Sequence, residues 1–496
     1  MTKSRDIASK QSDSGNSVAY GTSALAANTA ASGTAFGTYA LQTNTTGSAN
    51  TAVGYGGLRY NTTGSNNTAV GNGALFNNTI ANNNTAVGYF ALLANTTGGN
   101  NVAVGQGALQ TNTIGTLNTG IGTQALQVNT TGAANTAVGQ SALVANTVGS
   151  NNVAMGYGAL AANTTNGNLT AVGTFAMGAN TTGSGNAAFG YNALASSTAG
   201  TLNTAIGYSA LQSNTTGTDN TGVGFQALRA NTTGYYNTAV GRSALDNNTT
   251  GFANTAVGYA ALLSNTTGYQ NVAVGYGAGN SITTATDCTA IGSRALETNV
   301  TGPNNVAVGG FALRLATGGF QAAVGYAALG AVTTGIYNVA IGSNAGDNTT
   351  NGSNNISLGF NAKPASAGTS NTATIGDSSI TTLRCQVTSI TALSDARDKT
   401  DVESIPVGLD FINKLHPVTF TWNMRDGGKV GVKDTGFIAQ ELMATEDEAE
   451  LAEYLQLTYR ENPEKLEASQ GRLIPILVKA VQELSAKVAE LEAKVN

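Results

Sequence analysis

A glycine that recurs at fixed spacing constrains this chain more than any other feature. It follows an apolar residue in the idealised motif N-T-A-V-G-Y-G-A-L-L-A-N-T-T-G, and we call it the register glycine. Register glycines are 17 residues apart from Gly37 to Gly309 and from Gly325 to Gly376, and single 16-residue steps join Gly21 to Gly37 and Gly309 to Gly325. The ladder contains 22 repeats. Such a repeat predicts a solenoid with one structural unit per repeat.

Three neighbouring positions show how each repeat should fold. The residue before the register glycine is apolar, the one before that is small, and the fourth residue after it is usually leucine, as at Val53, Ala52 and Leu58. Each repeat is too short for two helices and too rich in Gly, Asn and Thr for one. We expect a short strand, a glycine turn, a second short segment and an Asn/Gly turn. Stacked coils would enclose a narrow core of Val and Leu columns beside Asn and Thr ladders, in a rod about 100 Å long.

Low-complexity disorder is the alternative, because Gly, Asn, Ser and Thr dominate this part of the chain. Disorder does not require an apolar residue at the same register of every repeat, and the chain has one. We therefore predict a mostly β rod over residues 17–380. Residues 1–16 are polar and unpatterned, and they form either an attachment segment or a frayed end.

Charge divides the chain in two near residue 394. The segment from Ser394 onward carries 31 charged side chains with a net charge of −7, whereas everything before it carries 18 with a net charge of +2. Two kinds of protein are therefore joined at this point. Neither part has a basic stripe, so we expect no binding to nucleic acid.

The sequence gives little sign of cofactor, metal or membrane chemistry. Cys288 and Cys385 lie far apart and are expected to be free, buried thiols. Residues 1–16 have no apolar run typical of a signal peptide, and no run approaches the ~20 apolar residues of a membrane span. The rod has no histidine, and its carboxylates are scattered singly. Because general acid–base work needs groups that face each other, we expect no catalysis there.

Aromatic residues recur directly after the register glycine. Such a column could stabilise the rod as a ladder of rings, or it could bind a ligand such as a host surface glycan by stacking on sugar rings. The candidates for this ligand-binding column are Tyr157, Tyr191, Tyr208, Tyr259 and Tyr276.

The coil motif, for example Asn101-Val102-Ala103-Val104-Gly105, resembles the repeats in the head domains of trimeric autotransporter adhesins. That resemblance implies a β-roll and a homotrimer, although the period here is longer. A thin single-chain roll has a small core, and burying a further apolar face between three chains would compensate for it.

Four motifs follow one another after the rod: SDARDKTDVESI, FINKLHPVTFTW, DTGFIAQEL and GRLIPILVKAVQELSAKVAELEAKV. Together they resemble the intramolecular chaperone auto-processing domain of phage tail fibres, tailspikes and endosialidases, over nearly all of residues 394–496. The resemblance implies self-cleavage at the Ser394–Asp395 bond by a Ser/Lys dyad, with Ser394 as nucleophile and Lys399 as base. Asp395 is a possible helper and Arg397 supports the motif, whereas Asp398 departs from the apolar residue more usual in the family.

The proposed chemistry sets two physical requirements. Lys399 can act as a base only if burial lowers the pKa of its ammonium group toward neutrality, so cleavage should need the folded trimer. Attack by Ser394 on its own carbonyl would close a strained four-membered ring. Attack from a neighbouring chain, or help from Asp395, would avoid this ring. The alternative is that Ser394 caps a turn and that Lys399 is a solvated charge.

The rest of the C-terminal domain looks structural. His416 lies beside a proline and is expected to be structural, and Phe420 and Trp422 alternate with Thr in a strand as core residues. The last helix has apolar residues at the 3-4 spacing of a heptad seam. By coiled-coil rules this pattern favours a dimer, whereas the family resemblance favours a trimer, which is our prediction. The seam residues are Ile474, Leu477, Val481, Leu484, Val488, Leu491 and Val495.

These observations predict a trimeric virion protein, a phage tail fibre or tailspike, assembled in the bacterial cytoplasm. Its parts would be an attachment segment at 1–16 for the tail or baseplate, a receptor-facing β-solenoid rod at 17–380, a neck at 381–393 and a self-releasing chaperone at 394–496. The alternatives are a spacer or decoration fibre without a receptor, an ice-binding solenoid or a surface adhesin. Irregular Thr rows count against ice binding, and the absence of a signal peptide and anchor counts against an adhesin.

Overall fold

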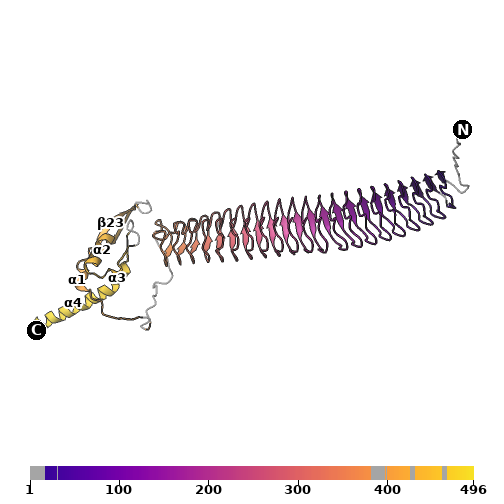
Figure 1. The fold of residues 1–496 in the computed structure, drawn as a ribbon. Coiled ribbons are helices and arrows are strands. Elements are labelled where there is room, and N and C mark those ends of the chain that lie inside the picture. The colour runs from indigo at the N-terminus through magenta and orange to yellow at the C-terminus, as the bar shows by residue number, and fades with distance from the viewer. Residues whose placement is uncertain are drawn as a thin grey trace. The chain divides into compact units, whose positions relative to one another are not determined.

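The computed structural model describes residues 17–30, 32–380, 397, 399–424, 430–460 and 466–495. They fall into two compact units, 1–321 and 322–496, and each is described by itself. Figure 1 shows the strands of the coils and the elements of the C-terminal domain. The predicted segment 1–16 and neck 381–393 lie outside the described residues, and the domain boundaries stay predictions.

The first unit is a stack of parallel strands with one strand per coil (Figure 1). Neighbouring strands pair in register, so that Thr68 faces Thr85 and Val70 faces Val87. A 17-residue offset thus brings each motif onto its copy in the next coil. The strands are β1 (Val18–Tyr20), β2 (Gly33–Phe36), β3 (Asn50–Val53), β4 (Thr68–Val70), β5 (Thr85–Val87), β6 (Val102–Val104), β7 (Thr119–Ile121), β8 (Thr136–Val138), β9 (Val153–Met155), β10 (Thr170–Val172), β11 (Ala187–Phe189), β12 (Thr204–Ile206), β13 (Thr221–Val223), β14 (Thr238–Val240), β15 (Thr255–Val257), β16 (Val272–Val274), β17 (Thr289–Ile291) and β18 (Val306–Val308).

The register glycine is fixed by its backbone and by the next coil. Gly105 has φ +132°, a region that favours glycine, and its amide donates to the Val87 carbonyl at 2.8 Å. A Cβ at this position would lie 2.6 Å from the carbonyl carbon and oxygen of Gly122 in the following coil. No side chain fits there, which explains why glycine recurs in every repeat.

Alanine and leucine, not valine and leucine, form the apolar core of each coil. Ala103 and Leu109 are fully buried, whereas Val87 and Ile121, the residues before register glycines, are 36% and 39% exposed. The prediction of a valine core column is therefore wrong. Side chains alternate along a strand, so burying the small alanine turns both of its neighbours outward, and only a small residue fits across so thin a coil.

A ladder of asparagines fills the polar half of the interior. Asn112 is fully buried, and its Nδ2 donates to Asn95 Oδ1 at 2.9 Å and to the Gly115 carbonyl at 3.0 Å. Its Oδ1 accepts from Asn129 Nδ2 at 2.8 Å, which continues the ladder. The Asn112 amide therefore links its own turn to the coil below and the coil above, and the predicted asparagine ladder is confirmed as an interior feature.

A second asparagine column lies at the start of each strand. The Asn118 amide N–H donates to Asn101 Oδ1 at 3.0 Å, and Asn118 Nδ2 donates to the Gly132 carbonyl at 2.8 Å. Threonines of the N-T-T-G turns behave differently from the prediction. Thr113 Oγ1 donates to the Thr130 backbone carbonyl at 3.1 Å, so these hydroxyls bond to the backbone of the next coil and form no side-chain ladder.

The second unit contains four further coil strands and a small C-terminal domain. The coil strands are parallel and keep the same register, with Val339 facing Ile356. They are β19 (Ala322–Val324), β20 (Val339–Ile341), β21 (Ile356–Leu358) and β22 (Ala373–Ile375). The domain consists of α1 (Leu409–Ile412), β23 (Val418–Asn423), β24 (Val430–Gly436), α2 (Ala439–Glu448), α3 (Ala452–Leu455), β25 (Thr458–Tyr459), β26 (Glu467–Ala468), the 3₁₀ helix η2 (Gln470–Arg472) and α4 (Leu473–Val495).

The core of this domain lies between α1, α3 and the first turns of α4. Leu457 and Ile476 are fully buried, and Phe411 and Leu473 nearly so. Glu483 of α4 accepts a hydrogen bond from the first amide of α1 at 2.8 Å, which holds the short helix against the long one. The predicted fold class, a mostly β solenoid of 17-residue coils followed by a small domain with a long last helix, is confirmed.

Candidate functional site

The residues predicted to cleave the chain are only partly described. Ser394 and Asp395 lie outside the described residues, and so does the Ser394–Asp395 bond. Arg397 and Lys399 are described, and both are exposed. The described residues therefore do not provide the burial that would make Lys399 a base, and the dyad stays a prediction.

The heptad side chains of α4 are exposed, although the helix has a second apolar face in the core. Leu473, Ile476 and Ala480 are buried against the domain. The seven predicted seam residues are between 44% and 86% exposed, from Leu477 to Val495. This face of α4 is thus a long apolar stripe that the described part of the chain leaves uncovered.

A buried carboxylate joins α2 to β25. Glu446 is fully buried, and its carboxylate accepts hydrogen bonds from Thr458 Oγ1 at 2.5 Å, from Arg460 Nη2 at 3.0 Å and from the Leu457 amide. Arg460 Nη1 also reaches Asp447 at 2.7 Å, and this hydrogen bond raises the pKa of the Arg460 guanidinium. Sequence reasoning missed this network, because no spacing in the sequence signals a contact between α2 and β25.

The lone histidine and the aromatic strand pair are not in the core. His416 is 71% exposed, with Nδ1 3.3 Å from Glu441 Oε2. Phe420 and Trp422 pack edge to face at 5.1 Å, and Trp422 Nε1 donates to Asp434 Oδ2 at 3.1 Å. The expectation that both rings are core residues is wrong, since both are only half-buried on the β23–β24 hairpin.

Cys288 takes the place of an asparagine in the second interior column. Its Sγ lies 3.4 Å from the Gly302 carbonyl, where an asparagine Nδ2 donates in other coils. Burial raises the pKa of the thiol to about 11, so it stays protonated at neutral pH. The prediction of a buried free thiol is confirmed for Cys288, and Cys385 lies outside the described residues.

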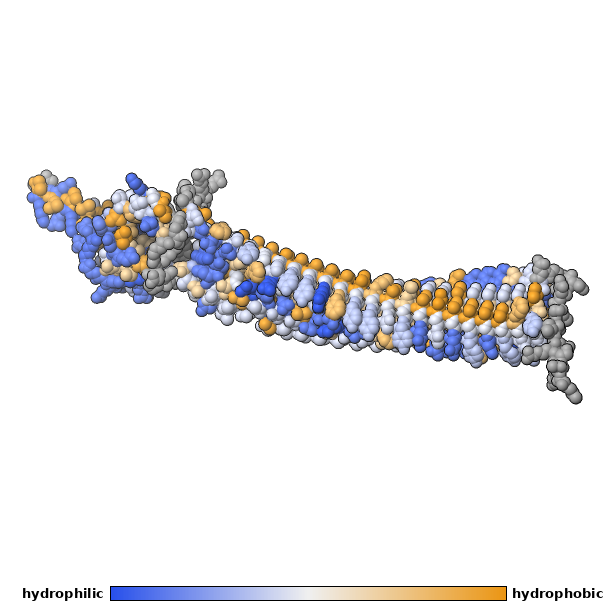
Figure 2. All heavy atoms as spheres, turned by 90° about the horizontal axis from the view of Figure 1, so that it is seen from above, coloured by the Kyte–Doolittle hydropathy of each residue, from blue (hydrophilic) through white to orange (hydrophobic). Residues whose placement is uncertain are grey.

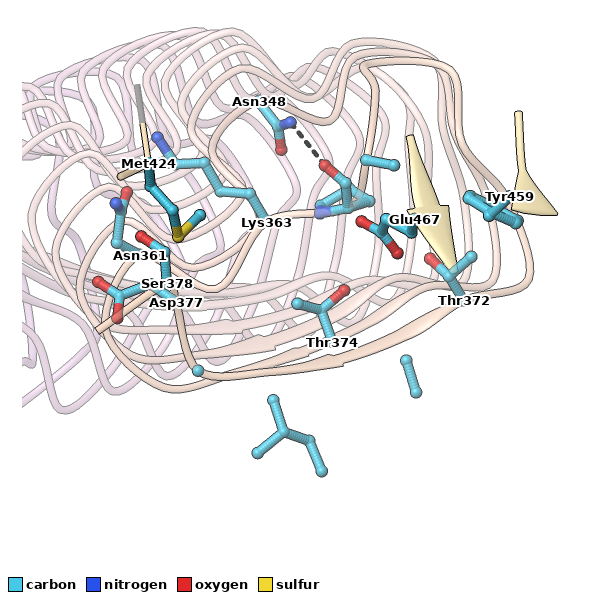
Figure 3. Close-up of a pocket in the computed structure, with 15 residues that line it drawn as sticks. Asn348, Asn361, Lys363, Thr372, Thr374, Asp377, Ser378, Met424, Tyr459 and Glu467 are labelled. Atoms are coloured by element: carbon cyan, nitrogen blue, oxygen red, sulfur yellow. Dashed lines mark hydrogen bonds between the residues drawn. The ribbon is translucent and has the colours of Figure 1, made fainter. Parts of the chain in front are cut away.

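The last coils border a hollow that offers hydrogen-bonding groups but no catalytic arrangement (Figure 3). Asn348 Nδ2 donates to the Pro364 carbonyl at 2.9 Å, and Lys363 pairs with Asp347 at 2.8 Å. These contacts link consecutive coils. Among the residues that line the hollow there is no nucleophile paired with a base.

The predicted ligand-binding tyrosines stack on their neighbours along the coils. Tyr191 and Tyr208 are 5.2 Å apart between ring centroids, and so are Tyr259 and Tyr276, with near-parallel planes in both pairs. Tyr157 instead packs edge to face on a phenylalanine. Stacked rings cover one another's faces, so the four stacked tyrosines present mainly their edges and hydroxyl groups to a ligand.

Comparison with known proteins gives a family match in the C-terminal domain. Residues 394–450 match the family model Peptidase_S74, described as chaperone of endosialidase. The prediction of a chaperone domain of this kind after the coils is confirmed, and the match supports a self-cleaving peptidase chaperone. A domain of this family implies that the fibre trimerises. No curated protein and no solved structure matches the chain.

Among the described residues, no cluster of three or more His, Cys, Asp or Glu side chains could hold a metal ion. Their helices also include none that is long and apolar enough to span a membrane.

Proposed function

We propose that the protein is a trimeric phage tail fibre or tailspike whose C-terminal domain guides trimerisation and then cuts itself off beside Ser394. The observation that carries this proposal is the chaperone-family match at residues 394–450, directly after a stack of near-identical coils. The rod is the receptor-facing part, and the N-terminal segment joins the tail.

Two uncovered apolar surfaces support assembly from three chains. One is the heptad stripe of α4. The other is the outward-facing column before the register glycines, which includes Val53, Ile206 and Val240 at 37–42% exposure. Figure 2 shows hydrophobic residues in a row along the stacked coils. Apolar ridges of this length are uncommon on monomers and are typical of interfaces.

A separate chaperone answers a physical problem of repeat fibres. Because the coils match one another, three rods shifted by one coil would keep nearly all their contacts. A globular trimer at one end would fix the register before the rods associate. Release of that domain would then remove the reverse path and leave the fibre kinetically stable.

Exposure of Lys399 in the single chain fits cleavage that depends on assembly. A lysine in water stays protonated at neutral pH and cannot take a proton from serine. A neighbouring chain of the trimer would bury this side chain and supply a serine to another chain's bond. Cleavage would then report correct assembly.

The test is the intact mass and oligomeric mass of the full chain beside the variants Ser394→Ala, Lys399→Ala and, as a matched lysine control, Lys414→Ala. Lys414 is exposed and pairs with Glu448 at 2.7 Å. We expect trimers in all four, with two fragments that break at or next to Ser394 in the wild type and in Lys414→Ala only. An uncut wild-type trimer would leave residues 394–496 as a permanent cap and would refute the release mechanism.

A further inference from the structure

Six successive coils present a continuous aromatic and cationic stack. We name it the post-glycine column, because each member directly follows a register glycine. The four tyrosines and the phenylalanine are 41–52% exposed, and the arginine is exposed as well. The members, in chain order, are Tyr191, Tyr208, Phe225, Arg242, Tyr259 and Tyr276.

The guanidinium of Arg242 replaces a ring in this stack. It lies 5.3 Å from the ring centroid of Phe225 in the coil before and 5.9 Å from that of Tyr259 in the coil after. Phe225 in turn stacks on Tyr208 at 5.3 Å. Two flanking rings restrict the orientation of the guanidinium, so less entropy is lost when an anion binds its exposed edge.

Arg242 is also without an acidic partner, unlike the arginines near it. Arg229 pairs with Asp246 at 2.9 Å, and Arg294 lies 3.5 Å from Glu297. Among the described residues, no carboxylate lies within 4 Å of the Arg242 guanidinium.

We propose that the post-glycine column binds an anionic polysaccharide laid along the rod, with its acidic group on Arg242. The hydroxyl groups of Tyr208 and Tyr259 would hydrogen-bond the sugars beside it. A row of similar groups repeated at about 4.8 Å suits a linear polymer with repeated hydroxyls. This inference rests on the proposed function, since it takes the rod to be receptor-facing and names its ligand class and position.

Ring-on-ring stacking within the column disfavours a mode in which sugars stack on these tyrosines, which is one of the two alternatives that the sequence leaves open. Their faces lie against one another, so a sugar meets ring edges and hydroxyl groups, and charge supplies the selectivity. A planar guanidinium can bind a carboxylate or a phosphate group through two parallel N–H donors. The shared requirement is therefore a fixed anionic group on the polymer, and the source of the anion is decided by experiment.

The test is binding of the purified full-length fibre to immobilised polygalacturonate, to its neutral methyl ester and to poly(glycerol phosphate), at low and physiological ionic strength. Variants are Arg242→Gln, Tyr259→Phe and the control Arg59→Gln. The control removes the same charge from Arg59. The Arg59 guanidinium lies 4.5 Å from the ring centroid of Tyr39, and its Nε donates a hydrogen bond to Gln42 Oε1 at 2.9 Å.

We expect wild type and Arg59→Gln to bind at least one anionic polymer and not the ester. Arg242→Gln should bind about five- to tenfold more weakly, and Tyr259→Phe about two- to fivefold more weakly. Preference for polygalacturonate or for poly(glycerol phosphate) identifies carboxylate or phosphate as the anion. Equal binding by Arg242→Gln and wild type, equal binding to the ester, or no binding to either anionic polymer would overturn the inference.

These outcomes are separate from those that test the proposed function. A fibre that trimerises and cleaves but ignores the anionic polymers refutes only the ligand inference. A fibre that binds them through Arg242 but is never cleaved refutes the release mechanism and leaves the binding site in place.

Discussion

Replacing Gly105 by alanine should open the stack locally, whereas the same change at Gly107, two residues later, should be tolerated. The two glycines belong to the same coil and both have positive φ. They differ in what surrounds a new Cβ. At Gly105 it would meet the Gly122 carbonyl group at 2.6 Å, whereas at Gly107 the nearest atom is Oε1 at the end of the Gln110 side chain, at 3.2 Å.

The two substitutions should differ in the free energy that they cost the folded stack. Ordinary contact begins near 3.4 Å, so the Gly105→Ala methyl group must push the next coil away by about 0.8 Å. The hydrogen bond from the Gly122 amide to Val104, now 2.7 Å, would then be lost. One hydrogen bond of about 1 kcal/mol and a backbone strain of about 2 kcal/mol give a loss of about 3 kcal/mol. Gly107→Ala should cost about 1 kcal/mol, since Ala260 already occupies the same column with φ +54°.

Amide hydrogen exchange measured by mass spectrometry checks this calculation in the full-length protein. In Gly105→Ala, peptides that cover residues 100–125 should exchange roughly a hundredfold faster than in the wild type. Peptides that cover residues 235–260 serve as an internal reference and should be unchanged. Equal protection in Gly105→Ala and Gly107→Ala would refute the steric explanation for the register glycine.

Two more predictions concern the interior of the coils. Asn112→Ala removes the buried donor to Asn95 Oδ1 and one of the two acceptors of Asn129 Nδ2. The unfolding free energy should therefore fall by about 2–4 kcal/mol, seen as a lower denaturant midpoint, and an unchanged midpoint would contradict a structural role for the ladder. Cys288 has a thiol pKa raised to about 11 by burial, so its contribution to stability is complete below about pH 8.5 and decreases as pH rises toward 11. Iodoacetamide at pH 8 should therefore label Cys288 far more slowly in the native protein than in urea, and equal rates would show that the site is open.

Much of the rod follows from its sequence because each repeat poses the same local problem. The spacing of register glycines gives the period, and the apolar residue before each one gives the strand. Leucine four residues later is buried as expected. The domain after residue 394 is signalled by its charge and by four motifs in order.

Other features depend on the cross-section of the coil, which no single repeat specifies. Pattern alone does not say whether alanine or valine faces inward, and the thin interior decides for alanine. Leucines such as Leu109 adopt φ +52°, an unfavourable backbone conformation for leucine that its complete burial offsets. A buried asparagine without partners would be costly, and most of these are stable because they have a partner in the next coil, as Asn112 has in Asn129. The network around Glu446 requires tertiary contacts that sequence spacing does not reveal.

The charge-free coils between Arg59 and Asp219 have a practical consequence for the durability of this part of the chain. These coils have no acidic, basic or histidine side chains, so no group titrates in them between about pH 4 and pH 9 and their stability should not change with pH over that range. Salt should also have little effect, because there are no ion pairs for it to screen. Trypsin, which cuts after lysine and arginine, finds no bond to hydrolyse from Tyr60 to Leu228, whether the coils are folded or open. Resistance to trypsin over this stretch therefore follows from its composition, in addition to any protection that folding provides.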